Sequence, residues 1–121
     1  MKSCFNLGII HLTGDGVAAD PVKAARVFRQ ACDGEEMRGC SSLGFMHDKG
    51  RGVAADSVKA ARLFRQACDG GEMTGCSNLG AMHAEGRGVA ADPVEAARFF
   101  RQACDGGVAR TCEQLKELEA K

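Results

Sequence analysis

The sequence predicts an all-α fold, a solenoid in which α/α-hairpins stack side by side along the chain. Two observations carry this prediction. The first is an internal repeat of 36 residues, marked by cysteines at positions 4, 40, 76 and 112, and periods of this length are typical of repeat proteins. The second is that each repeat holds two segments with the apolar spacing of a helix. One hairpin cannot bury both of its faces alone, so the repeats are expected to pack against their neighbours.

The chain divides into three repeats and a terminal segment, residues 1–39, 40–75, 76–111 and 112–121. More than half of the repeat columns are identical in all three repeats. In the last segment Leu115 and Leu118 share one side of a predicted helix, and charged residues occupy the rest. Terminal repeats need a polar outer surface. The segment is therefore predicted to be a C-terminal capping helix of one continuous solenoid.

Each repeat is predicted to contain a first and a second helix. One face of the first helix carries four residues at helical spacing. In the second repeat these residues are Cys40, Leu43, Gly44 and His47. That helix is expected to end at Gly50. The second helix is expected to begin after an aspartate, at Asp20, Asp56 and Asp92, because Asp is a good N-cap and Pro suits the first helical position.

Composition excludes several classes of function. Sixteen Lys and Arg balance sixteen Asp and Glu, so the sequence lacks the excess positive charge that nucleic-acid binding needs. No apolar stretch reaches the roughly 18 residues of a transmembrane helix. The only aromatic residues are six phenylalanines, which are poor material for stacking bases or sugars. We expect no nucleic-acid partner and no membrane insertion.

Histidine and serine are the residue types from which a metal site or a catalytic site could be built. His11, His47 and His83 occupy one column, and helices packed about 8–10 Å apart would set them in a row rather than around one metal ion. Packing histidines are the favoured interpretation, and no metal or cofactor is predicted. The signatures S-x-x-K, S-D-N, K-T-G and G-x-S-x-G are absent. The sequence therefore predicts a protein that is not an enzyme.

The seven cysteines can pair in two ways. Within hairpins the pairs would be Cys4–Cys32, Cys40–Cys68 and Cys76–Cys104; between repeats they would be Cys32–Cys40, Cys68–Cys76 and Cys104–Cys112. Both partners of a given cysteine lie at the same end of an antiparallel hairpin. Loop-closure entropy separates the two loops by only about 1 kcal/mol. Spacing alone leaves both pairings open, with reduced buried thiols as a third alternative.

Repeats two and three carry the pattern C-x-x-L-G-x-M-x-x-x-G-x-G-V-x-x-D-x-x-x-A-x-x-x-F-x-x-A-C-D-x-G. It resembles the Sel-one-like repeat (SLR) family, relatives of the tetratricopeptide repeat, and more narrowly the Helicobacter cysteine-rich proteins. The resemblance implies pairing between repeats, with Cys4 left free. The sequence departs from the family where the usual aromatic residue of the first helix is histidine.

Three disulfides imply an oxidising compartment: the periplasm, secretion, or the mitochondrial intermembrane space in a eukaryote. Stacked repeats present a continuous surface that suits binding, so we expect a non-catalytic, disulfide-bridged scaffold that binds a protein or a peptide, and we expect a monomer. The alternative, by resemblance alone, is a penicillin-interacting protein with weak β-lactamase activity.

Sequence variation between repeats lies mainly on the first helices, whereas the second helices barely change. In relatives of this fold the first helices line the concave side, so the resemblance implies a partner-binding groove there. We expect it to contain Asn6, Phe45, Asp48, Asn78 and Glu85, and these residues to face the concave side more than Arg26, Arg62 and Arg98 do. Variation caused by solvent exposure alone is the alternative.

Overall fold

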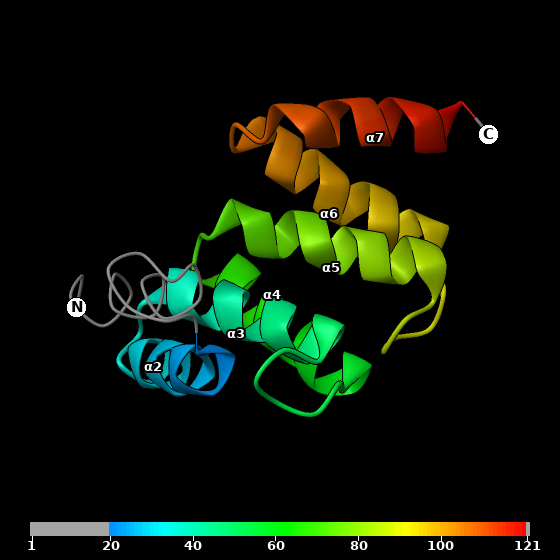
Figure 1. The fold of residues 1–121 in the computed structure, drawn as a ribbon. Coiled ribbons are helices and arrows are strands. Elements are labelled where there is room, and N and C mark those ends of the chain that lie inside the picture. Colours follow the sequence, from blue (N-terminus) through cyan, green and yellow to red (C-terminus); the bar gives the residue numbers. More distant parts are fainter. Residues whose placement is uncertain (1–19, 121) are drawn as a thin grey trace.

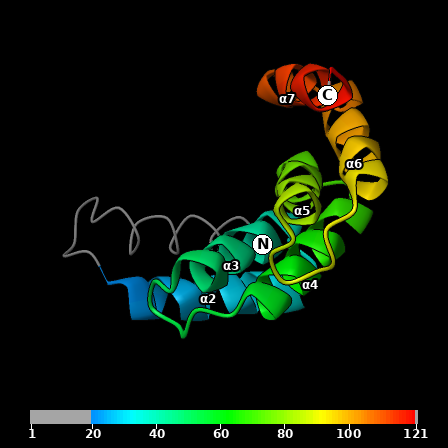
Figure 2. The ribbon, with the colours of Figure 1, turned by 90° about the vertical axis from the view of Figure 1, so that its right-hand side faces the viewer.

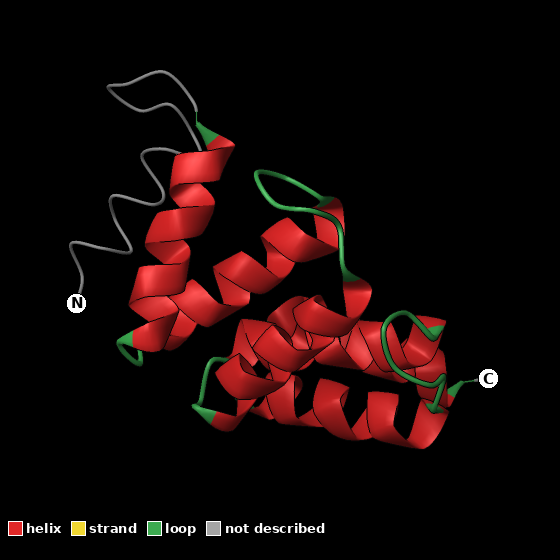
Figure 3. Cartoon of the chain, turned by 90° about the horizontal axis from the view of Figure 1, so that it is seen from below, coloured by secondary structure: helices red, strands yellow, loops and turns green. Residues whose placement is uncertain are grey.

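The computed structural model describes residues 20–120, which form six α-helices and no β-strand (Figure 1). The helices are α2 (Pro21–Asp33), α3 (Met37–Lys49), α4 (Ser57–Asp69), α5 (Met73–Glu85), α6 (Pro93–Asp105) and α7 (Ala109–Glu119). Each helix packs chiefly against the helices that precede and follow it in the chain. The longer loops join α3 to α4 and α5 to α6, and the others are tight turns (Figure 3). The predicted all-α solenoid is confirmed.

The stack of helices is curved, as Figure 2 shows. The second helices of the repeats, α2, α4 and α6, follow the outer side of the curve, and the first helices, α3, α5 and α7, follow the inner side. The inner side is therefore built from the helices whose residues vary most between repeats.

The second helices begin where the sequence predicts. Asp20, Asp56 and Asp92 are the N-caps of α2, α4 and α6. Their carboxylates accept hydrogen bonds from backbone N–H groups in the first turn, for example that of Lys59 at 3.1 Å from Asp56. Such a bond satisfies one of the donors that a helix N-terminus leaves unpaired.

The first helices begin three residues earlier than the predicted face implies. α3 starts at Met37 and α5 at Met73, because Glu36 and Glu72 act as N-caps and accept from the backbone N–H two residues ahead. Glutamate is not among the preferred N-cap residues, so these helix starts could not be predicted from residue type. The ends agree with prediction, since the C-cap Gly50 has φ of 67°, a left-handed conformation that suits glycine.

Close packing inside each hairpin depends on small residues. A Cβ atom on Gly44 would lie 2.8 Å from Cε1 of Phe64, and one on Gly80 would lie 2.7 Å from Cδ1 of Phe100. The two phenylalanine rings therefore occupy the space above a glycine of the neighbouring first helix. Both rings are almost fully buried, and they form the centre of the second and third repeats.

The loops that follow α3 and α5 also pack against the neighbouring repeat. At Gly52, a Cβ atom would lie 2.2 Å from the carbonyl oxygen of Pro21, and at Gly88 the same distance from that of Ser57. The loop of one repeat thus rests on the start of the second helix of the repeat before it.

Three disulfides link each second helix to the first helix that follows: Cys32–Cys40, Cys68–Cys76 and Cys104–Cys112. The Cα atoms are 4.6, 4.6 and 4.8 Å apart. This is the pairing between repeats, and the pairing within hairpins does not occur among the described cysteines. Cys4 lies outside the described residues. Three such bonds are typical of proteins from oxidising compartments.

The terminal helix α7 starts at Ala109, three residues before the predicted segment. It lies against α6 at the end of the stack. Thr111 is fully buried and its Oγ1 donates a hydrogen bond to Oγ of Ser77 at 3.0 Å. On its outer side, Arg101 of α6 forms an ion pair with Glu119 at 3.0 Å. These contacts fasten α7 to both helices of the third repeat.

Candidate partner-binding groove

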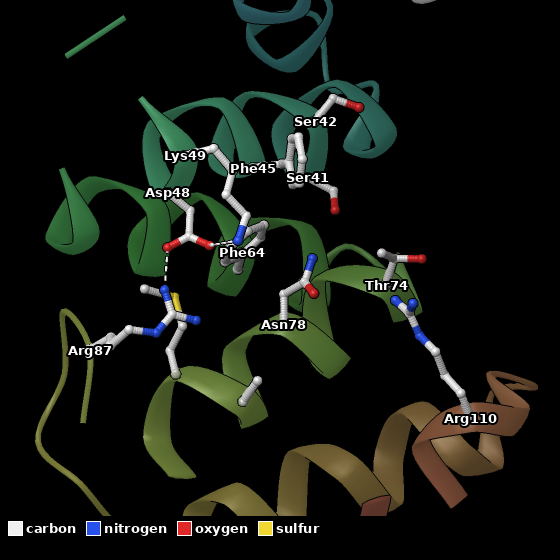
Figure 4. A pocket seen from close by; sticks show the side chains of 12 residues that line it. Ser41, Ser42, Phe45, Asp48, Lys49, Phe64, Thr74, Asn78, Arg87 and Arg110 are labelled. Carbon is white, nitrogen blue, oxygen red and sulfur yellow. Dashed lines mark hydrogen bonds and ion pairs between the residues drawn. The ribbon is translucent and has the colours of Figure 1, made fainter. Parts of the chain in front are cut away.

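A groove of about 430 Å³ lies on the inner side of the curve, between α3 and α5 (Figure 4). Most of its lining comes from these two first helices, and the rest comes from α4, α7 and the loop after α5. The lining residues are Ser41, Ser42, Phe45, Asp48, Lys49, Phe64, Thr74, Asn78, Ala81, Met82, Arg87 and Arg110. The groove exists because α5 is turned relative to α3 by the curvature of the stack.

The apolar part of the groove presents one large side chain to solvent. Phe45 on α3 is 40% exposed, whereas Phe64 and Met82 beneath it are almost completely buried in the core. Ala81 occupies the Phe45 column in the next repeat, and its small side chain leaves room opposite the ring. An exposed aromatic ring beside open space is the kind of anchor point that binding surfaces use.

One end of the groove is closed by a charged network that joins two repeats. Asp48 on α3 forms an ion pair with the guanidinium of Arg87, which follows α5, and Arg87 also pairs with Glu85 at 3.2 Å. Nζ of Lys49 lies 3.9 Å from the same Asp48 carboxylate. The Asp48 side chain is only 9% exposed. It therefore acts as a bridge between repeats rather than as an open contact point.

The middle and the other end of the groove carry polar side chains. Asn78 points into the groove between Phe64 and Thr74, and Arg110 of α7 reaches toward Thr74 from the opposite side (Figure 4). The side chains of Asn78 and Thr74 form no hydrogen bond with another described residue. An amide that can both donate and accept is suited to a peptide backbone.

The predicted groove residues are distributed as follows. Phe45, Asp48 and Asn78 line the groove. Glu85 lies outside it, on a separate hollow between α5 and α7, and its side chain is 56% exposed. Asn6 lies outside the described residues.

The three arginines predicted to avoid the concave side do not line the groove. They are nevertheless exposed, while Asp48 and Asn78 are half-buried, so exposure alone does not separate the two sets. Arg98 places its guanidinium 4.5 Å from the centre of the Phe99 ring. Arg62 borders an inter-repeat hollow that Leu43 also lines.

Two of the groove residues that were not predicted from the sequence are arginines, Arg87 and Arg110. Asp48 and Arg87 are 39 positions apart, three more than the repeat period, and opposite charges at that offset were the available signal. In the preceding repeat Leu12 stands in the Asp48 column, so the pattern does not recur. Arg110 falls within the third repeat, and its column, which holds Arg38 and Thr74 in the other repeats, carries no pattern that singles it out.

The histidines of the described repeats are packing residues, as predicted. His47 is 5% exposed and His83 8%. Nδ1 of His47 lies 3.1 Å from the carbonyl oxygen of Ala54, and Nδ1 of His83 lies 3.3 Å from that of Ala90. Each histidine thus ties the following loop to its helix. His11 lies outside the described residues.

Within residues 20–120, no group of three or more His, Cys, Asp or Glu side chains is placed to hold a metal ion. None of the helices described in that range combines the length and the apolar character needed to cross a membrane.

The fold is similar to that of several known repeat proteins. A protective antigen of uropathogenic Escherichia coli strains, which displays an SLR fold, aligns with a TM-score of 0.91 at 29% identity over 94% of this chain and 24% of its own. A Sel1 repeat protein of Oxalobacter formigenes aligns with a TM-score of 0.89 at 22% identity over 94% of this chain and 47% of its own. The chain thus spans less than half the length of either protein.

Cysteine-rich protein B of Helicobacter pylori aligns with a TM-score of 0.73 at 31% identity, over 77% of this chain and 70% of its own. Comparison with curated protein sequences finds no match. The family model of the Sel1 repeat matches three segments, residues 2–35, 38–72 and 74–108, which together cover most of the sequence. The repeated hairpins, the disulfides between repeats and these matches lead to one conclusion: the chain belongs to the Sel1 repeat family.

Proposed function

We propose that this protein is a non-catalytic, disulfide-bridged scaffold that binds a protein or peptide partner in the groove between α3 and α5. The observation that carries the proposal is the pairing of an exposed aromatic ring, Phe45, with unpartnered polar side chains in a cavity of about 430 Å³. Apolar contact gives affinity, and hydrogen bonds to a peptide backbone give orientation.

The architecture supports binding by a preorganised surface. Disulfides join every described second helix to the next first helix, and the Asp48–Arg87 ion pair joins α3 to the loop after α5. A groove held in this way loses less conformational entropy when a partner docks.

The proposed location is the periplasm or the outside of the cell, or the intermembrane space of a mitochondrion. The three disulfides support it. The E. coli protein with a similar fold also supports it, because that protein is a protective antigen. We propose a monomer, which sedimentation equilibrium would test.

A variant pair tests the proposed function. Partners captured by the protein from its native compartment are identified, and the affinity of one purified partner is measured for each variant. Phe45→Ala is expected to weaken binding by about 1–3 kcal/mol, which is roughly 5- to 150-fold in Kd.

Val58→Ala is the matched control, because Val58 is 49% exposed but lies on the outer helix α4. It should leave affinity unchanged, and both variants should keep the wild-type circular dichroism spectrum. Equal effects of the two substitutions, or none from Phe45→Ala, would refute binding in this groove.

A further inference from the structure

Two of the three described first helices, α3 and α5, begin with a glutamate whose carboxylate caps the helix. In α3, the Glu36 carboxylate accepts from the backbone N–H of Arg38 at 3.3 Å and from its guanidinium at 3.1 and 3.2 Å. In α5, Glu72 accepts from the backbone N–H of Thr74 at 2.9 Å. The hydrogen bond from the Arg38 side chain holds the pKa of Glu36 below its ordinary value. This position therefore favours an ionised carboxylate.

The third described case, α7, keeps the donors but lacks the carboxylate. Val108 stands in the column of Glu36 and Glu72, and Arg110 stands in the column of Arg38. The start of α7 has no side-chain cap. Within residues 20–120, Arg110 forms no ion pair, although its counterpart Arg38 is bound at two points.

Arg110 is also the uncompensated charge of the groove. At the opposite end, Lys49 and Arg87 are balanced by Asp48 and by Glu85 beside it. Arg110 instead extends from α7 toward Thr74, with Asn78 across the opening (Figure 4). An unpaired guanidinium facing a cavity attracts an anion, and its planar fork matches a carboxylate.

We infer that the groove recognises a partner segment through an acidic side chain, a glutamate or aspartate whose carboxylate binds Arg110 where Glu36 binds Arg38. An apolar side chain of the same segment packs on Phe45. This inference rests on the proposed function and adds the chemistry of the partner to it.

The occupant is an acidic side chain rather than a chain end, because the hollow continues past this point. A second hollow of about 230 Å³ shares Ser41, Ser42 and Thr74 with the groove and runs on between Arg38 and Glu72. A bound segment can therefore extend in both directions from Arg110. The carboxylates that occupy this position at the start of α3 and α5 likewise belong to side chains, those of Glu36 and Glu72, and not to a C-terminus.

Retention of short peptide pools on the immobilised, oxidised protein tests the inference. The pools have acetylated and amidated ends and are randomised except for one central position, which is Glu in one pool and Gln in the other. Charge-assisted hydrogen bonds are about twice as strong as neutral ones, so the Glu pool should be enriched by about fivefold or more over the Gln pool. The preference should fall in high salt.

Three variants complete the experiment. Arg110→Gln should abolish the Glu preference, whereas Arg101→Gln, at an arginine paired with Glu119 on the outer side, should retain it. Val108→Glu supplies the missing carboxylate within the chain, where it can cap α7 and bind Arg110, so it should also abolish the preference.

The outcomes separate the two proposals. If both pools are retained equally and Phe45→Ala reduces their retention, the protein binds peptides in the groove but does not recognise an acidic side chain. The inference is then wrong, and the proposed function is not. The inference would also be wrong if Arg110→Gln left the Glu preference unchanged. It would be wrong too if a Gln pool with a free C-terminus were retained more strongly than the Glu pool with blocked ends, because Arg110 would then bind a chain end. If no pool is retained at all, the proposed function fails together with this inference.

Discussion

Gly75 of α5 lies directly against α4, and replacing it with alanine is expected to destabilise the fold. A Cβ atom at this position would lie 2.8 Å from Cβ of Ala67, 2.8 Å from the carbonyl oxygen of Phe64 and 3.1 Å from the backbone nitrogen of Cys68. Carbon atoms in optimal contact are about 3.5–4.0 Å apart. Two of these three obstacles are backbone atoms, so the helices themselves must separate.

The magnitude follows from two opposing effects. Overpacking a well-packed core costs about 1–3 kcal/mol, and backbone obstacles place this site near the upper end. Replacing a helical glycine with alanine returns about 1 kcal/mol through helix propensity. The net loss in the free energy of unfolding is expected to be about 2 kcal/mol, which corresponds to a fall in Tm of roughly 10 °C for a domain of this size.

Gly70→Ala is the matched control, because the new Cβ would approach its nearest neighbours even more closely. Those neighbours are Cγ and Sδ of the Met37 side chain, at 2.4 and 2.5 Å, and a flexible methionine can move aside. Urea unfolding of both variants without reductant compares the two costs. If Gly75→Ala is no more destabilising than Gly70→Ala, close backbone packing does not control stability here.

The remaining predictions concern the disulfides, the terminal helix and catalysis. Replacing Cys68 and Cys76 together with serine should lower the free energy of unfolding by about 2.5 kcal/mol, from the entropy of a short loop; an unchanged urea midpoint would argue against this contribution. Ending the chain after Thr111 should expose Phe100, which borders α7 residues in the structure. The truncated protein should melt at a lower temperature and associate in size-exclusion chromatography, whereas a monomer with an unchanged melting curve would show that α7 is not a cap. Nitrocefin should not be hydrolysed above the buffer rate, and turnover that follows the purified monomer would restore the β-lactamase alternative.

The helices of this fold can be predicted from the sequence, because the signals for them are local. Aspartate N-caps, glycine C-caps and apolar residues at helical spacing each act within one or two turns, and the 36-residue period repeats them. The starts of α3 and α5 were missed for an equally local reason, since the N-caps Glu36 and Glu72 are unusual residue types at that position. Burial of His47 and His83 also followed from the sequence, because each lies on the apolar face of its own helix.

The contacts between different repeats could not be predicted, because they depend on how successive hairpins are oriented. Both candidate partners of Cys68 lie at the same end of a hairpin, so the bond to Cys76 depends on how tightly successive helices approach, which spacing does not encode. The contact of Asp48 with Arg87 and the place of Arg110 in the groove depend on the small rotation from one repeat to the next. That rotation accumulates from many interhelical contacts, and it sets the curvature that turns the first helices into a groove.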